Sequence, residues 1–217
     1  VMDDLKAFHV PVLILSGGEP LLRRDIFDVS RRAKQMGFYV GLSTNGTLIK
    51  VHNIEAIADI GYDYVGVSLD GLRETHDQFR RRDGAFEESL AGVRLCRDHG
   101  IKVGLRFTIN KFNVDEIPAV FDLMEEMDIP RVCFYHLVYA GRGSKMVEED
   151  LSLEDTRKAV DLIIDRTTAL HDKGLAKEVL TVDNHADGPY LYLRLLKEDP
   201  ERAAEVLELL KMNEGNS

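Results

Sequence analysis

The sequence contains no tryptophan and only two cysteines among 217 residues. Cys96 and Cys133 are far apart and stand in unrelated surroundings, so they predict neither a disulfide framework nor a cysteine cluster for a metal. Basic residues are also outnumbered, because 28 Lys and Arg oppose 38 Asp and Glu and the formal net charge is −10. Such a chain is not expected to hold nucleic acid through a general phosphate-binding field.

Long apolar runs are absent as well. No stretch approaches the roughly 18 to 20 residues that a membrane span needs, and the first residues lack the basic start and apolar middle of a signal peptide. We therefore expect a monomer of the cytoplasm with no membrane contact. Both ends look cut, and we interpret the chain as part of a longer protein. Its length suffices for one sizeable core.

Two patterns alternate along the chain. Short apolar, β-branched runs predict strands at 12–15, 39–43, 64–69, 102–109 and 131–137. Amphipathic stretches between and after them predict helices at 23–36, 50–60, 85–99, 115–127 and 154–172. Strands that are apolar on both sides and alternate with helices indicate βαβ units and a parallel sheet. The pattern favours a partial (β/α) barrel, with a doubly wound sheet as the alternative.

Glycine and proline residues support the predicted ends of the helices. Gly37, Gly61 and Gly100 each follow a helical pattern, as expected for left-handed helix ends, and Pro130 is assigned the same role. Residues 1–8 are expected to form a helix before the first strand. We place a partial barrel core at 1–172 and a C-terminal extension at 173–217, with an extended segment at 177–184 and one or two helices within 189–210.

The predicted strand ends are polar or rich in glycine. Four segments carry this signal, and in parallel α/β folds they meet at one edge: Ser16-Gly17-Gly18-Glu19-Pro20, Ser43-Thr44-Asn45-Gly46-Thr47, Ser68-Leu69-Asp70-Gly71 and the stretch from His136 to Gly143. The fourth predicted strand, 102–109, carries Arg106 toward the same edge. Their convergence predicts a binding site.

Glu19 is the most informative residue of this edge. Two glycines before it allow a ligand to approach the backbone closely, its carboxylate can accept a charge-assisted hydrogen bond from a cation, and Pro20 can start a helix. The pattern fits a clamp for an amino group. The alternative is that Glu19 only stabilises the start of the helix that follows.

Three motifs, GGEP, STNG and SLDG, resemble those of the radical S-adenosylmethionine (SAM) superfamily. The resemblance implies a (β/α)6-type radical SAM barrel, truncated at both ends and followed by a helical extension. It implies that GGEP grips the amino group of SAM, that Ser68 and Arg106 meet its ribose and carboxylate, and that Leu137 borders its adenine. The full set of cofactor residues assigned in this way is Gly17, Gly18, Glu19, Pro20, Thr44, Asn45, Ser68, Asp70, Arg106 and Leu137.

The strings FYHLVYAGRGS and HADGPY resemble a subgroup of that superfamily that trims side chains from didecarboxysirohaem. This implies removal of acetate groups to give iron-coproporphyrin III in haem biosynthesis. The alternatives are removal of propionates for the haem of nitrite reductase, decarboxylation of coproporphyrin, modification of a peptide, or a SAM- or haem-binding module without a cluster. An ordinary aldolase or isomerase is disfavoured, because no lysine stands at a strand end.

The family's cluster motif, CxxxCxxC, does not occur in the sequence. The resemblance therefore implies a [4Fe–4S] cluster whose ligands lie outside this chain, a second iron–sulfur cluster at a missing C-terminal segment, and an electron donor of ferredoxin or flavodoxin type. Cleavage of SAM in this family produces a 5′-deoxyadenosyl radical that takes hydrogen from the substrate. Cys96 and Cys133 are interpreted as core residues, so no metal ligand is assigned within the chain.

An iron tetrapyrrole with several carboxylates is the expected substrate. Arginine suits such groups, so Arg142 and Arg81 are candidate anchors, with Tyr139 and His185 as further substrate contacts. His136 at a strand end is the candidate catalytic residue. The alternative readings are a solvated loop for Arg80–Arg82 and a hydrogen-bonded structural role for His136. We expect His76 and Asp77 to organise the loop after SLDG.

Overall fold

The computed structural model describes residues 1–212, apart from the side chain of Arg142. The chain forms two compact units: Val1–Phe107 with Asp122–Val132, and Thr108–Phe121 with Cys133–Ser217. Six strands follow one another in a single sheet in the order β1-β2-β3-β4-β5-β6. A doubly wound sheet would reverse its strand order at a switch point, so this order decides for the partial barrel.

The first unit is built on parallel strands. β1 (Val12–Leu15) pairs with β2 (Tyr39–Thr44), β2 with β3 (Tyr64–Ser68), and β3 with β4 (Val103–Thr108). Their burial alternates with the pleat, since Val40, Leu42, Val65 and Val67 are almost fully buried. The residues between them on the other face, apart from glycines, remain partly accessible. One face of the sheet is therefore packed, and the other can receive a ligand.

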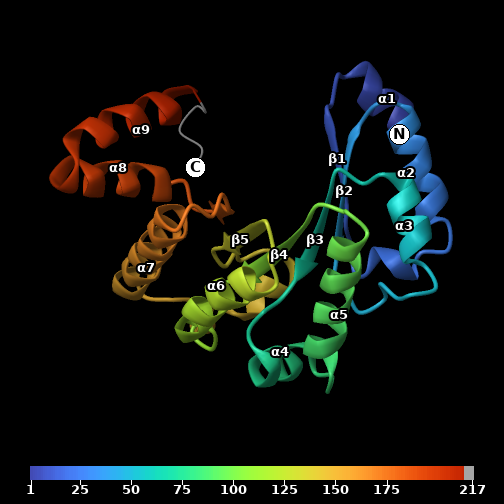
Figure 1. Cartoon of the computed structure of the whole chain (residues 1–217), viewed down its shortest axis with the longest axis horizontal. Helices are drawn as coiled ribbons and strands as arrows, with labels where there is room; N and C mark the ends of the chain where they lie inside the picture. The colour runs from blue at the N-terminus through green and yellow to red at the C-terminus, as the bar shows by residue number, and fades with distance from the viewer. Residues whose placement is uncertain (213–217) are drawn as a thin grey trace. The chain divides into compact units, whose positions relative to one another are not determined.

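Helices cover the packed face of β1–β3 (Figure 1). They are α2 (Ile26–Gln35), α3 (Ile54–Ile60) and α5 (Ala85–Asp98), and the short helices α1 (Met2–Ala7) and α4 (Arg73–Arg80) complete this part. Apolar residues of these helices, such as Ile57 and Val93, lie at 0% and 1% exposure. Burial of this apolar surface is the main stabilising contribution to the unit.

The remaining elements continue the strand–helix alternation. They are α6 (Ile117–Glu126), β5 (Arg131–Tyr135), α7 (Leu153–Asp172), β6 (Glu178–Val182), α8 (Asp187–Glu198) and α9 (Pro200–Met212), with 3₁₀ turns η1 (Pro20–Leu22), η2 (Val114–Glu116), η3 (Gly141–Lys145) and η4 (Val147–Glu149). Ser152 caps α7 by accepting a hydrogen bond from the backbone N–H of Asp155 at 3.1 Å. Helices α8 and α9 pack against each other as a hairpin (Figure 1).

The predicted strands and helices are confirmed, with three differences. Helix α6 is followed by Asp128 in the left-handed region, with φ 49°, so Asp128 and not Pro130 makes the turn. The segment 189–210 is two helices, of which the first already begins at Asp187. Helix α4 was not expected, because half of the residues in its sequence RETHDQFR are charged and it buries only His76. Arg80 is therefore the last residue of a helix and not part of a loop.

Candidate functional site

The carboxylate of Glu19 joins the segments that follow β1 and β2. Its Oε1 accepts hydrogen bonds from the backbone N–H of Leu21 at 3.0 Å and from Oγ1 of Thr44 at 2.7 Å. Its Oε2 accepts one from the backbone N–H of Asn45 at 2.7 Å. The bond to Leu21 caps η1, so the helix-start interpretation holds locally. The other two bonds fix the carboxylate at the edge of the sheet, where it can also face a cation.

Open backbone precedes Glu19. A Cβ atom placed on Gly17 or Gly18 would find no protein atom within 4 Å, and both residues are exposed. Gly17 has φ +145°, which side chains rarely allow. Pro20 is buried and starts η1. The Gly-Gly segment therefore offers its N–H and C=O groups to a ligand beside an anchored carboxylate.

The turn after β2 is held rigidly. Thr44 Oγ1 accepts a hydrogen bond from the N–H of Gly46 at 3.1 Å, and Asn45 Oδ1 accepts one from the N–H of Thr47 at 2.8 Å. From α5, the hydroxyl of Ser89 donates to the carbonyl of Asn45 at 2.7 Å. The side chains of Thr44 and Asn45 thus position Glu19 and the turn, and the backbone beside them forms the edge of the site.

Arg106 places a cation on the open face of the sheet. It lies in register with Ser68 on β3, and its Nη1 donates a hydrogen bond to the hydroxyl of Ser43 on β2. Its stem crosses Gly66, where a Cβ atom would come within 2.7 Å of the Arg106 Cδ. All three polar side chains are half-buried. A guanidinium in this setting suits a carboxylate ligand.

Asp70 has a different environment from the other predicted cofactor residues. Its side chain lies at 6% exposure and forms an ion pair with Nη2 of Arg80 at 2.5 Å. Its backbone N–H donates to Nδ1 of His76 at 3.0 Å. The carboxylate is therefore engaged inside the loop that follows β3, and its visible contacts are structural.

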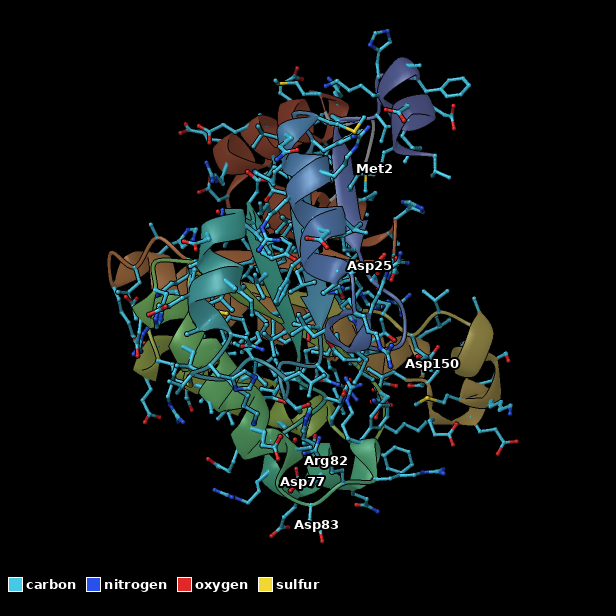
Figure 2. All side chains as sticks on the ribbon, turned by 90° about the vertical axis from the view of Figure 1, so that its right-hand side faces the viewer. Met2, Asp25, Asp77, Arg82, Asp83 and Asp150 are labelled. Carbon is cyan, nitrogen blue, oxygen red and sulfur yellow. The ribbon has the colours of Figure 1, made fainter. Side chains whose placement is uncertain are left out.

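His76 and Asp77 organise that loop, as expected. Burial, followed by the nearby charge of Arg80, lowers the pKa of His76 to about 4. Asp77 accepts hydrogen bonds from the N–H groups of Gly84 at 2.6 Å and Phe86 at 2.8 Å, and thereby caps α5. The hydrogen bond from Phe86 lowers the pKa of the Asp77 carboxyl most, and the one from Gly84 lowers it further. Figure 2 shows Asp77, Arg82 and Asp83 together at the turn between α4 and α5.

The predicted substrate contacts are mostly at the surface. Arg81 is exposed and ends α4 in the left-handed region, with φ 54°, and Arg82 pairs with Glu88 at 2.7 Å. Tyr139 is 53% exposed and donates to Asp150, an interaction that raises the pKa of the Tyr139 hydroxyl. His185 is exposed. Leu137, which was predicted to border the adenine of SAM and not to contact the substrate, follows β5 and is half-buried. The side chain of Arg142 lies outside the described part of the structure.

His136 stands directly after β5, and its pairing with Asp187 was not foreseen from the sequence. Its Nε2 lies 2.7 Å from Oδ2 of Asp187, at the start of α8. The side-chain exposures are 14% for His136 and 6% for Asp187. Asn184 donates from Nδ2 to the other oxygen of Asp187 at 2.8 Å. The only signal in the sequence was an acid two residues after His185 at a helix start.

The two cysteines belong to the packed interior. Cys96 is 0% exposed and Cys133 is 7% exposed, and neither forms a disulfide. Burial raises the pKa of the Cys96 thiol to about 12. Within residues 1–212, no group of three or more His, Cys, Asp and Glu side chains is arranged to hold a metal ion. The same described residues contain no helix long and apolar enough to span a membrane.

Parallel strands in chain order, with Gly-Gly-Glu-Pro after one strand and polar ends on the next ones, define a barrel of the radical SAM type. The chain belongs to the Radical SAM superfamily, whose family model matches residues 1–124. Members of this superfamily use SAM and a [4Fe–4S] cluster. The fold is similar to that of SuiB of Streptococcus suis in its crystal structure with the precursor peptide SuiA. The TM-score is 0.73 at 19% identity, over 88% of this chain and 43% of that one.

Two curated relatives are similar over most of the chain. The Fe-coproporphyrin III synthase of Methanosarcina barkeri is 62% identical over 217 residues, which are 100% of this chain and 54% of the relative. The pre-heme d1 synthase of Dinoroseobacter shibae is 45% identical over 190 residues, which are 87% of this chain and 47% of the relative. The chain thus spans about half the length of these relatives.

The residues present fit SAM and do not fit the cluster. For SAM, the open Gly17-Gly18 backbone, the anchored Glu19 carboxylate and the Arg106 guanidinium supply acceptors for an ammonium and a donor for a carboxylate. For the cluster, the only thiols of the chain are two buried core cysteines, one in α5 and one in β5. The assignment of individual residues to SAM stays a prediction.

Proposed function

We propose that this chain forms the SAM-binding and substrate-binding part of a radical SAM enzyme that removes acetate side chains from didecarboxysirohaem to give iron-coproporphyrin III. The observation that carries the proposal is the 62% identity to the Fe-coproporphyrin III synthase of M. barkeri, because it extends over the whole chain. Bound SAM and the cluster supply the radical chemistry. The residues described above bind and orient SAM at the edge of the sheet.

The division of tasks follows from the site. Glu19 and the Gly17-Gly18 backbone would take the amino group of SAM, and Arg106 its carboxylate. Our candidates for contact with the substrate remain His136, Tyr139, Arg81, Arg142 and His185. The carboxylates of the substrate favour cationic and hydrogen-bonding partners. Electrons would come from a ferredoxin or flavodoxin, and we propose a cytoplasmic monomer. Two buried cysteines that form no disulfide are compatible with a reducing compartment.

Removal of propionates is the second candidate. It is supported by the 45% identity to the pre-heme d1 synthase of D. shibae, but this similarity is lower and covers 87% of the chain. The two reactions start from the same kind of tetrapyrrole and differ in which side chains are lost. Mass spectrometry of the product therefore distinguishes them.

The decisive experiment uses a protein of full family length that contains this chain, with its clusters reconstituted under anaerobic conditions. It would be incubated with SAM, a reductant and didecarboxysirohaem. We expect 5′-deoxyadenosine together with a tetrapyrrole that has lost two acetates and kept its propionates. Loss of propionates instead would support the second candidate, and 5′-deoxyadenosine without a change in the tetrapyrrole would contradict both.

A further inference from the structure

A directional chain of hydrogen bonds ends on His136, and its direction can be read from one backbone group. The N–H of Ala186 donates to Oδ1 of Asn184 at 3.1 Å. A backbone N–H is always a donor, so the atom facing it must be the amide oxygen. This fixes the orientation of the Asn184 amide and leaves its Nδ2 to donate to Oδ1 of Asp187 at 2.8 Å.

In the same way, the hydrogen bond to Asp187 shows which nitrogen of the His136 imidazole carries the hydrogen. Asp187 is almost fully buried, and its second oxygen lies 2.7 Å from Nε2 of His136. A carboxylate accepts, so Nε2 of His136 carries the hydrogen. A neutral imidazole has one donor and one acceptor nitrogen, so Nδ1 is left as the acceptor. The ring is also anchored through its backbone, since the N–H of His136 donates to the carbonyl of Val182 on β6 at 2.9 Å.

We infer that Asn184 and Asp187 are positioning residues that hold His136 with Nδ1 as an acceptor for a carboxyl group of the substrate. A carboxylate and an Nδ1 lone pair repel each other unless one proton lies between them. Binding therefore takes up one proton from the solvent, and the carboxyl group and Nδ1 share it. The assignment to a substrate carboxyl rests on the proposed function. The tautomer assigned to His136 follows from the hydrogen bonds alone and is independent of the proposed function.

A buried carboxylate behind the imidazole serves this purpose, because it orients the ring and stabilises the positive charge that develops when Nδ1 gains a share of a proton. The sequence places the three residues far apart, with His136 after β5 and the Asn184–Asp187 pair 48 to 51 positions later. The pairing therefore depends on the fold of this unit and not on local sequence.

The test is nitrogen NMR of the histidine side chains in the 217-residue chain, with His52→Asn as the exposed control variant. We expect a pyridine-like Nδ1 and a pyrrole-like Nε2 for His136. In Asp187→Asn, the Asn184 amide still donates to Oδ1, so the new NH₂ group faces Nε2 and the two signals of His136 exchange their character. In the double variant Asp187→Asn, Asn184→Ala, the new amide can rotate and the exchange becomes incomplete.

The substrate contact is tested by adding metal-free coproporphyrin III. Nδ1 of the unchanged chain should shift toward a pyrrole-like signal, the tetramethyl ester of the porphyrin should cause no such shift, and Asp187→Asn should show none with either. A wild-type Nδ1 that already carries the hydrogen overturns the inference. Binding of the porphyrin without a response of Nδ1 overturns the substrate contact.

Absence of any porphyrin binding contradicts the proposed substrate class and with it the contact. The exchanged signals in Asp187→Asn would even then establish the positioning role. Circular dichroism and the methyl spectrum of each variant show whether it has folded, so a loss of structure is recognised before the histidine signals are compared.

Discussion

Oε2 of Glu19 accepts a hydrogen bond from the backbone N–H of Asn45 at 2.7 Å, while Oε1 accepts two others, from Leu21 and Thr44. Three donors therefore converge on one carboxylate across two strand ends. Such an arrangement holds the carboxylate in place. Its position next to two open glycines makes it the most informative residue for testing the SAM site.

Glu19→Gln should weaken SAM binding roughly 10- to 100-fold, because a charged hydrogen bond contributes about 1.5 to 3 kcal/mol. The amide oxygen would stay where Leu21 and Thr44 donate, so the NH₂ group would face the N–H of Asn45. Calorimetry with SAM on a cluster-loaded protein of full family length measures the effect. Glu55→Gln on the exposed surface of α3 is the matched control. Equal affinities for both variants would remove Glu19 from the SAM site.

His76 should make the stability of the chain depend on pH. Its folded-state pKa of about 4 lies below the ordinary value of 6.5, so the folded state favours the neutral ring. The associated stability is complete above about pH 6.5 and is lost as the pH falls toward 4, by on the order of 3 kcal/mol. Urea unfolding at pH 7.5, 6.0 and 4.5, chosen as rough points across this window, would follow the loss.

The control for this prediction is His76→Asn, whose side-chain oxygen can accept the hydrogen bond from Asp70 but does not titrate. The variant should lose less stability over the same pH range than the unchanged chain. If both lose the same amount, other groups cause the pH dependence and the neutral state of His76 has no part in it.

Strands, helix ends and strand-end motifs could be predicted from the sequence because they are local. A buried parallel strand shows a continuous apolar run, and a left-handed helix end needs a residue such as Gly61. Helix α4 was not predicted, because the only side chain that it buries is that of His76. The ion pair of Asp70 with Arg80 was missed together with α4, because that helix carries Arg80. The pair of His136 with Asp187 was missed because these residues are distant in sequence and only the fold brings them together. Thr44 and Asn45 were placed at the edge of the site, but their bonds to Glu19 were not foreseen.

Cys96 should be unreactive in the folded chain. Burial raises its pKa from 9.0 to about 12, which lowers the thiolate fraction near neutral pH about a thousandfold. Cys133 is also buried, at 7% exposure, so a chromogenic disulfide reagent should label neither cysteine of the native chain within the time in which it labels both in denaturant. Mass spectrometry identifies the site if one reacts. Rapid native labelling of Cys96 would contradict its place in the core.

Gly92→Ala should destabilise the fold by about 1 to 3 kcal/mol, which is typical of overpacking. A Cβ atom at Gly92 on α5 would lie 2.5 Å from the carbonyl oxygen of Gly46, so the helix and the turn after β2 would have to separate. Because alanine is also the better helix former, any loss of stability must come from this contact. Urea unfolding gives the magnitude, and Arg94→Ala on the exposed side of α5 is the control.

Gly92→Ala also tests whether the packing of α5 supports the predicted SAM site. Ser89 on α5 donates to the carbonyl of Asn45, whose N–H holds Glu19, so a displaced helix would pull on the turn that anchors the carboxylate. In the cluster-loaded protein, Gly92→Ala should therefore weaken SAM binding although residue 92 lies on the packed side of the sheet, and Arg94→Ala should not. Unchanged SAM affinity in a measurably destabilised Gly92→Ala would show that the turn keeps its geometry without the support of α5.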